Sequence, residues 1–216
     1  MTVIKKRVGV LISGGGTNLQ ALLDATATPD YPAEIALVVS NNPDAYGLKR
    51  AETAGVKSIA IDHRDYEDRA SFEAAIQDAL KSAKVEIVCL AGFMRILTAP
   101  FVNAWAGRML NVHPSLLPDY KGLNTYARAL ADDVERFGCS VHIVTPNLDD
   151  GPVLVQGVTE IIPNETQETL EPRVHALEQR TYPMALKLLT SGRFSIREDK
   201  AEVNGENLPI IVSDTC

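Results

Sequence analysis

The chain has 216 residues, which suits one α/β domain with a sizeable core. Hydrophobic residues make up 45% and charged residues 23%, as in an ordinary soluble globular protein. The net charge is -7 and no basic cluster is present, which argues against nucleic-acid or anionic-membrane binding. No apolar run reaches the length of a membrane span, and no signal peptide is recognisable. The three cysteines include no C-x-x-C pair, so we expect a reducing, cytoplasmic setting without disulfides or structural zinc.

Hydrophobic runs alternate with amphipathic stretches along the first half of the chain. Continuous β-branched runs predict buried parallel strands, and apolar residues at helical spacing predict the helices between them. The expected strands are 7–13, 33–41, 56–61, 85–93 and 108–114, and the expected helices are 17–27, 44–55, 65–83 and 98–107. Strands that alternate with helices through short loops predict an α/β fold with a doubly wound, mostly parallel sheet.

The pattern changes after about residue 138. Residues 139–162 predict two strands around a polar turn, which form an antiparallel C-terminal extension of the sheet. Residues 168–192 predict one long helix, and its expected apolar face consists of Leu170, Val174, Leu177, Met184 and Leu188.

A glycine-rich turn, ISGGGTN, lies between the first strand and the first helix. Backbone N–H groups at such a turn can bind an anion without a lysine. The turn lacks the Gly-Lys-Ser/Thr of a Walker loop, and Leu19 occupies the third glycine position of a dinucleotide fingerprint. A phosphate monoester therefore fits better. The alternative is a tight turn with Thr17 or Asn18 as the helix N-cap.

Two polar side chains close the strand at 108–114. Asn111 and His113 are two residues apart and point to the same face, and Pro114 ends the strand. An amide beside an imidazole can stabilise an oxyanion, whereas a structural histidine is the alternative interpretation. Asp149 and Asp150 precede Gly151, which is commonly turn chemistry, but a carboxylate near His113 would assist proton transfer. This set indicates acyl or one-carbon transfer without a metal or a covalent enzyme intermediate.

Four segments, in this order, resemble the phosphoribosylglycinamide formyltransferases, which belong to the folate-dependent formyltransferase superfamily. They are VLISGGGTNLQALLDA, VCLAGFMRIL, LNVHPSLLPDYKGL and LDDGPVLVQ. The resemblance runs from about Arg7 to about Gly192 and implies a formyltransferase-like fold. We expect a single domain over residues 1–216, with a phosphate-binding half at about 1–105, a catalytic and folate-binding half at about 106–192, and a tail at 193–216.

The resemblance also implies the reaction. The formyl group of 10-formyltetrahydrofolate passes directly, through a tetrahedral intermediate, to the amine of glycinamide ribonucleotide in purine biosynthesis. No metal or nicotinamide cofactor is implied. We expect these two small molecules as the only partners and the protein to be a monomer or weak homodimer.

The family motifs assign roles to residues of this chain. Asn111, His113 and Asp149 match the catalytic set. The residues that match the phosphate-binding motif are Gly14, Gly15, Gly16, Thr17 and Asn18. Glu178 and, weakly, His175 match positions that contact other parts of the substrate. The residues that match the folate-binding segments are Met94, Arg95, Ile96, Leu97, Val144 and Asn147. Without the resemblance, Glu178 would be interpreted as a solvated helix charge, and Met94, Ile96 and Leu97 as plain core.

Three positions depart from the family pattern. Asn124 and Tyr126 stand where histidines are common, and Asp150 stands where a small residue is common. Formyltetrahydrofolate hydrolase is the nearest alternative, but its added domain would need residues before the first strand. Methionyl-tRNA formyltransferase would need a second domain and a basic surface. A non-catalytic phosphate-binding module and an NAD-dependent dehydrogenase are the more distant alternatives.

Overall fold

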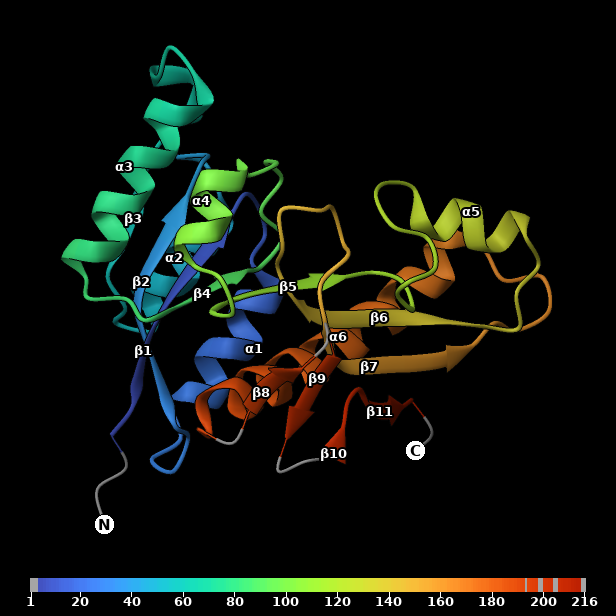
Figure 1. The fold of residues 1–216 in the computed structure, drawn as a ribbon. Coiled ribbons are helices and arrows are strands. Elements are labelled where there is room, and N and C mark those ends of the chain that lie inside the picture. Colours follow the sequence, from blue (N-terminus) through green and yellow to red (C-terminus); the bar gives the residue numbers. More distant parts are fainter. Residues whose placement is uncertain (1–3, 193, 198–199, 204–205, 215–216) are drawn as a thin grey trace. The chain divides into compact units, whose positions relative to one another are not determined.

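A computed structural model of the chain describes residues 4–192, 194–197, 200–203 and 206–214. The chain divides into two compact units, Met1–Leu110 and Asn111–Cys216. The first unit is built on parallel strands and the second mostly on antiparallel ones (Figure 1).

The first unit contains a parallel sheet in the order β4-β1-β2-β3. Its strands are β1 (Lys6–Ile12), β2 (Ala33–Ser40), β3 (Ser58–Ala60) and β4 (Ile87–Leu90). β1 lies between two neighbours, and its Val8, Val10 and Leu11 are fully buried. A strand buried on both faces requires the continuous apolar run that the sequence shows.

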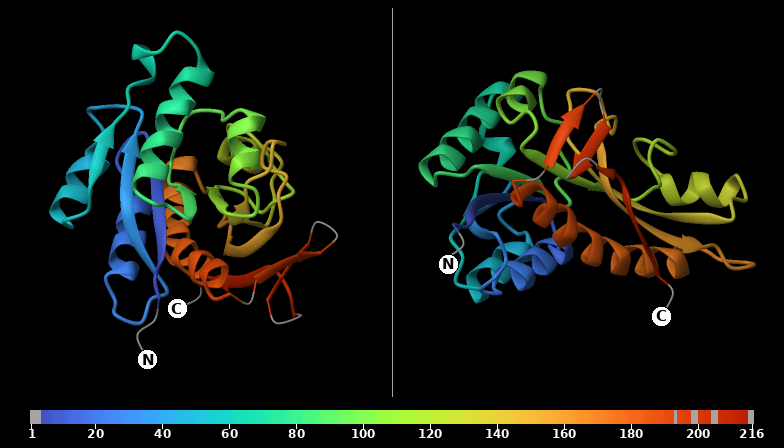
Figure 2. Two further views of the ribbon diagram at one scale, coloured as in Figure 1. Left: turned by 60° about the vertical axis from the view of Figure 1, so that its left-hand side comes forward. Right: turned by 60° about the horizontal axis from the view of Figure 1, so that its bottom comes forward.

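Helices cover both faces of this parallel sheet (Figure 2). α1 and α2 pack together on one face, and α3 and α4 lie on the other. Their bounds are α1 (Thr17–Thr26), α2 (Tyr46–Thr53), α3 (Arg69–Ser82) and α4 (Ala99–Ala104), and a short 3-10 helix, η1 (His63–Asp65), follows β3. The doubly wound arrangement predicted for this part of the chain is therefore confirmed.

The second unit contains the antiparallel extension. Its strand order is β11-β7-β6-β5, with β6 antiparallel to β7 and β7 parallel to β11. The elements are β5 (Met109–His113, of which residues 111–113 belong to this unit), α5 (Thr125–Ala131), β6 (Arg136–Ile143), β7 (Val153–Glu160), α6 (Gln167–Thr190) and β11 (Ile210–Ser213). A separate antiparallel sheet in the order β10-β9-β8 contains β8 (Phe194–Arg197), β9 (Lys200–Val203) and β10 (Glu206–Asn207).

α6 packs against β6 and β7 with a face that differs in part from the predicted one. Leu170, Val174 and Leu177 are buried as expected, but Met184 is exposed and Leu186 is buried in its place. The predicted face followed a seven-residue spacing from Leu170 to Met184. An α-helix drifts by about 20° per seven residues, so this spacing leaves the buried face after two repeats.

Among the described residues, no helix is both long and apolar enough to cross a membrane.

Candidate functional site

The second unit brings a buried imidazole and a buried carboxylate together. His113, the last residue of β5, places Nδ1 3.4 Å from Asp149 Oδ2. Its Nε2 lies 3.0 Å from the Tyr120 carbonyl oxygen. A carbonyl only accepts, so Nε2 carries a hydrogen, and an imidazole with hydrogens on both nitrogens would donate to both neighbours. His113 and Asp149 are 6% and 8% exposed, so water screens this pair little.

Asp149 is held in place by the backbone of the loop that follows β5. It adopts a left-handed conformation, with a φ of 49°, and its Oδ2 accepts the Gly122 N–H at 3.0 Å. Short polar residues tolerate this conformation better than branched ones. Asp149 therefore both forms the turn that the sequence suggests and places its carboxylate beside His113.

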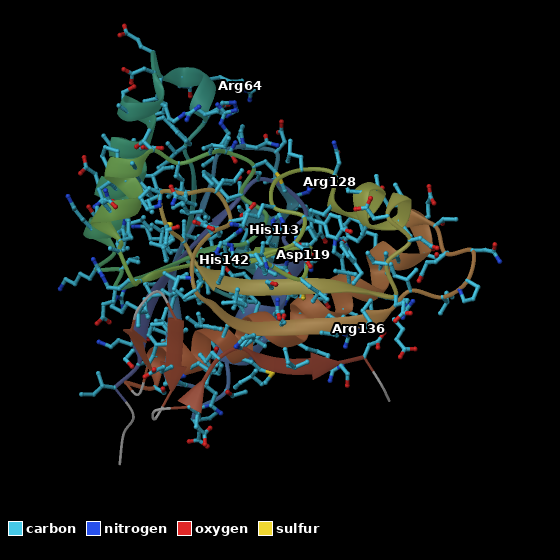
Figure 3. All side chains as sticks on the ribbon, turned by 45° about the vertical axis from the view of Figure 1, so that its right-hand side comes forward. Arg64, His113, Asp119, Arg128, Arg136 and His142 are labelled. Carbon is cyan, nitrogen blue, oxygen red and sulfur yellow. The ribbon has the colours of Figure 1, made fainter. Side chains whose placement is uncertain are left out.

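His142 is a third buried polar group at this place, and sequence analysis did not single it out. It lies in β6, and its Nε2 is 3.3 Å from Asn111 Nδ2 and 3.7 Å from Asp149 Oδ1. Figure 3 shows His113 and His142 close together in this part of the second unit. Both faces of β6 are buried, and His142 lies on the same face as Ser140, opposite the apolar face of Cys139, Val141 and Ile143.

The hydrogen bonds of His142 fix the orientation of Asn111. Burial lowers the pKa of His142 to about 4, against smaller raising effects from the Ile143 carbonyl and Asp149. Its Nδ1 lies 3.0 Å from that carbonyl and so carries the hydrogen of the neutral ring. Its Nε2 then accepts one N–H of the Asn111 amide and so sets the orientation of that amide.

Asp150, unlike Asp149, points its charge at the surface. Its carboxylate pairs with Lys121 and accepts from Asn147 Nδ2 at 3.3 Å. The hydrogen bonds from Lys121 and Asn147 lower the pKa of Asp150. The extra charge that the sequence places beside Asp149 is thus balanced locally by Lys121. Of the predicted folate residues in this unit, Val144 is half-buried and Asn147 exposed, both after β6.

The two positions where family histidines are replaced lie at the start of α5. Asn124 is its N-cap in a left-handed conformation, with a φ of 57°. Tyr126 is buried against Phe137, with ring centroids 5.3 Å apart. Burial, then the charge of Glu178, raise the pKa of Tyr126.

α6 contributes the two predicted substrate contacts. Glu178 is only 5% exposed, so its interpretation as a solvated helix charge is wrong. A carboxylate this buried needs partners, which a surface position would not. His175 is half-exposed, and its Nε2 lies 3.8 Å from Glu171 one turn earlier.

The glycine loop lies in the first unit, between β1 and α1. Gly16 is the N-cap of α1 with a φ of 71°, so the interpretation of Thr17 or Asn18 as the cap is wrong. A glycine cap offers no side-chain acceptor to the first turn of the helix. A Cβ added at Gly14 or Gly15 would meet no atom within 4 Å. The loop therefore borders open space, as an anion site requires.

Residues 94–97 of the first unit are exposed rather than plain core. Met94 and Ile96 are 74% and 66% exposed, Arg95 is exposed, and Leu97 is half-buried. The Met94 N–H donates to Ser13 Oγ at 2.7 Å, which ties this segment to the residue before Gly14. The Ser13 hydroxyl in turn donates to Asn41 Oδ1 at 2.5 Å. Single exposed methionines are common, but two large apolar side chains in one short loop suit a ligand-binding surface.

Within the described residues, no three His, Cys, Asp or Glu side chains are arranged to hold a metal ion.

Comparisons with known proteins identify the family. The formyl transferase family model matches residues 6–186. The phosphoribosylglycinamide formyltransferase of Haemophilus influenzae is 41% identical over 94% of this chain and 96% of its own length. The trifunctional purine biosynthetic protein adenosine-3 of Chironomus tentans is 47% identical over 94% of this chain, which spans only 15% of that protein. The solved phosphoribosylglycinamide formyltransferase of Coxiella burnetii superposes with a TM-score of 0.90 at 43% identity, over 96% of this chain and 99% of its own.

Proposed function

The chain belongs to the formyl transferase family, and from this premise we propose that it formylates glycinamide ribonucleotide with 10-formyltetrahydrofolate as the donor. The resemblance found in the sequence is confirmed at the level of the family and of the predicted mostly parallel fold. The observation that carries the proposed reaction is the cluster of half-buried Asn111 with buried His113 and Asp149.

The cluster suits acyl transfer to an amine. The substrate amine attacks the formyl carbon, a new N–C bond forms, and the carbonyl electrons move onto oxygen. The second N–H of Asn111 is a donor for this oxyanion, and His113 becomes another donor when its Nε2–H leaves the Tyr120 carbonyl for the oxyanion. Donors held in advance stabilise such a charge strongly. The attacking nitrogen loses a proton as it is acylated, and Asp149 is the carboxylate that accepts it, directly or through water.

Collapse of the tetrahedral intermediate completes the transfer. The bond between the formyl carbon and the folate nitrogen breaks, and that nitrogen takes up a proton. His113 supplies this proton, and Asp149 stabilises the charged imidazole until it takes up the amine proton. Proton exchange with water then returns both groups to their starting states. The products are the formylated amine and tetrahydrofolate, and the sequence of steps needs no redox partner.

The remaining contacts are proposed from the family motifs together with the surroundings of each residue. The open loop Gly14–Gly16, with Thr17 and Asn18, binds the phosphate of the substrate. Glu178, buried on α6, contacts its ribose or glycinamide part, and His175 contributes weakly. Exposed residues 94–97 of the first unit, and Val144 and Asn147 of the second, form folate contacts.

A transfer assay separates this function from a formyltetrahydrofolate hydrolase. Purified protein is mixed with 10-formyl-5,8-dideazafolate, with and without glycinamide ribonucleotide, and the deformylated folate is followed by absorbance. We expect turnover only when the amine is present. Equal turnover with and without glycinamide ribonucleotide would indicate a hydrolase. A non-catalytic phosphate-binding module would show no turnover in either mixture.

The His113→Asn variant tests the cluster. We expect kcat to fall at least about a hundredfold, the scale of losing a general acid–base or oxyanion group. Asp149→Asn is the matched variant, and the double variant should lose little more than either single one, because the two groups act as a unit. Near-parental turnover by folded His113→Asn would remove His113 from the mechanism.

A further inference from the structure

Two carbonyl groups of the glycine loop are turned toward α2. The Gly14 carbonyl accepts the Gly47 N–H at 3.0 Å, and the Gly15 carbonyl accepts Arg50 Nε–H at 2.8 Å. The contact is close: a Cβ added at Gly16 would lie 2.8 Å from Gly47 Cα. α2 therefore supports the loop through one backbone bond and one guanidinium bond.

These bonds set the direction of the N–H groups of the loop. In a planar trans peptide the carbonyl and the following N–H point to opposite sides. Holding the Gly14 and Gly15 carbonyls toward α2 therefore directs the N–H groups of Gly15 and Gly16 away from it. An anion binds such N–H groups when they are held in advance.

Arg50 is itself held in position. Its Nη1 donates to Gln20 Oε1 at 3.1 Å, and Gln20 Nε2 donates to Asp24 Oδ1 at 2.8 Å. Its guanidinium also lies 5.1 Å from the centre of the Tyr46 ring, a cation–π contact. The loop has no lysine or arginine, and the chain carries a net charge of -7. Arg50 thus brings a fixed positive charge to a loop that lacks one.

We infer that Arg50 is a positioning residue for the phosphate of the substrate. It holds the Gly15 carbonyl, so that the loop N–H groups face the phosphate, and adds one positive charge behind them. The inference rests on the proposed function, since it assigns the loop to a phosphate. It predicts that Arg50 affects binding of the phosphate-bearing substrate and leaves the chemical step unchanged.

Two substrates separate this role from a structural one. With glycinamide ribonucleotide, Arg50→Met should raise KM about tenfold, the scale of one charge-assisted hydrogen bond, with kcat and the KM for the folate unchanged. With the matching glycinamide riboside, which lacks the phosphate, kcat/KM should be equal for Arg50→Met and the parent. An equal loss on both substrates, or none on either, would overturn the inference.

Two further variants control for charge and folding. Lys49→Met removes an equal charge one residue away on α2, and it should leave the KM for the ribonucleotide unchanged. A rise as large as that of Arg50→Met would overturn the inference. Arg50→Lys keeps the charge but not the planar fork, so it should recover only part of the affinity. It provides the same comparison with the parent if Arg50→Met fails to fold.

Titration calorimetry with ribose 5-phosphate separates failure of this inference from failure of the proposed function. The parent should bind it, and Arg50→Met should bind it about tenfold more weakly. A parent that neither binds it nor formylates the ribonucleotide would refute the proposed function. If the parent binds ribose 5-phosphate and formylates the ribonucleotide, and Arg50→Met binds ribose 5-phosphate equally tightly, only the role of Arg50 would be refuted.

Discussion

At the scale of single residues, the second unit uses two buried histidines in different ways. His142 is neutral and accepts from the Asn111 amide, whereas His113 lies between a carboxylate and a carbonyl. The neutral state of His142 results from burial, which outweighs the attraction of Asp149. One buried ring thus orients an amide, while the other has a carboxylate and a carbonyl as its neighbours.

The neutral state of His142 makes folding stability depend on pH. Its pKa is about 4 in the folded chain against an ordinary value of 6.5, so the unfolded chain binds more protons between these values. Its contribution to stability is complete above about pH 6.5 and is lost as the pH falls toward 4. We expect this residue alone to lower the free energy of unfolding by about 2 kcal/mol from pH 7 to pH 5.

Urea unfolding at both pH values, for the parent and for His142→Gln, measures this contribution. The glutamine variant does not titrate, so its loss between the two pH values should be smaller than that of the parent by about 2 kcal/mol. The difference between the two proteins is the measured quantity, which removes the effect of other titrating groups. Equal losses would mean that folding does not lower the pKa of His142.

At the scale of elements, strand periodicity predicted more of the site than loop chemistry did. The same-face pair Asn111 and His113 follows from the two-residue period of β5. The closeness of Asp149 depends on its left-handed turn and on Gly122, and no spacing rule predicts such a contact. Alternation along β6 places His142 on one face with Ser140, but the spacing of residues does not show that this face is buried beside Asn111 and Asp149.

Hydropathy misjudges burial in opposite directions in a helix and in a loop of this chain. Without the resemblance, the sequence pattern interprets Glu178 as a solvated charge, but the residue is buried, because more of the surface of α6 is packed than its apolar residues indicate. Without the resemblance, hydropathy interprets Met94 and Ile96 as core, but both are exposed, because they lie in the loop after β4. Hydropathy measures only the preference of a side chain for burial. At binding surfaces, apolar side chains are commonly exposed and charged ones commonly buried.

The C-terminal strand offers a test at this scale. Arg173 on α6 donates to Glu165 Oε1 at 2.9 Å and to Asp214 Oδ2 at 3.0 Å, and Asp214 directly follows β11. The side chain of Glu165 is fully buried. Arg173→Met removes the charged partner of that carboxylate and leaves it the Ile162 N–H, 3.0 Å from Oε2. We therefore expect a loss of about 2 kcal/mol in the free energy of unfolding.

Denaturant titration and hydrogen exchange of β11 amides would measure this loss. Lys187→Met is the matched control, because Lys187 is exposed on the same helix. It should change neither quantity. If Arg173→Met exchanges its β11 amides no faster than the parent, the ion pairs do not hold the strand.

At the scale of the whole molecule, the number of domains remains a prediction. Residues 1–216 were predicted to form a single domain, whereas the chain clusters into two compact units, each with its own buried residues. β5 contains Met109 and Leu110 of the first unit and Asn111 and His113 of the second. β5 is one continuous strand, with two residues in the first unit and three in the second.

We therefore expect the two units to unfold together, and two buried cysteines report on them separately. Cys89 lies in β4 of the first unit and Cys139 in β6 of the second, and both are fully buried. Burial raises the pKa of the Cys139 thiol to about 12, so the folded chain presents almost no thiolate there. Pulsed alkylation at each urea concentration, resolved by peptide mass spectrometry, gives an unfolding curve for each cysteine. In a single cooperative domain the two midpoints coincide. Separate midpoints would show that the units are independent domains joined through β5.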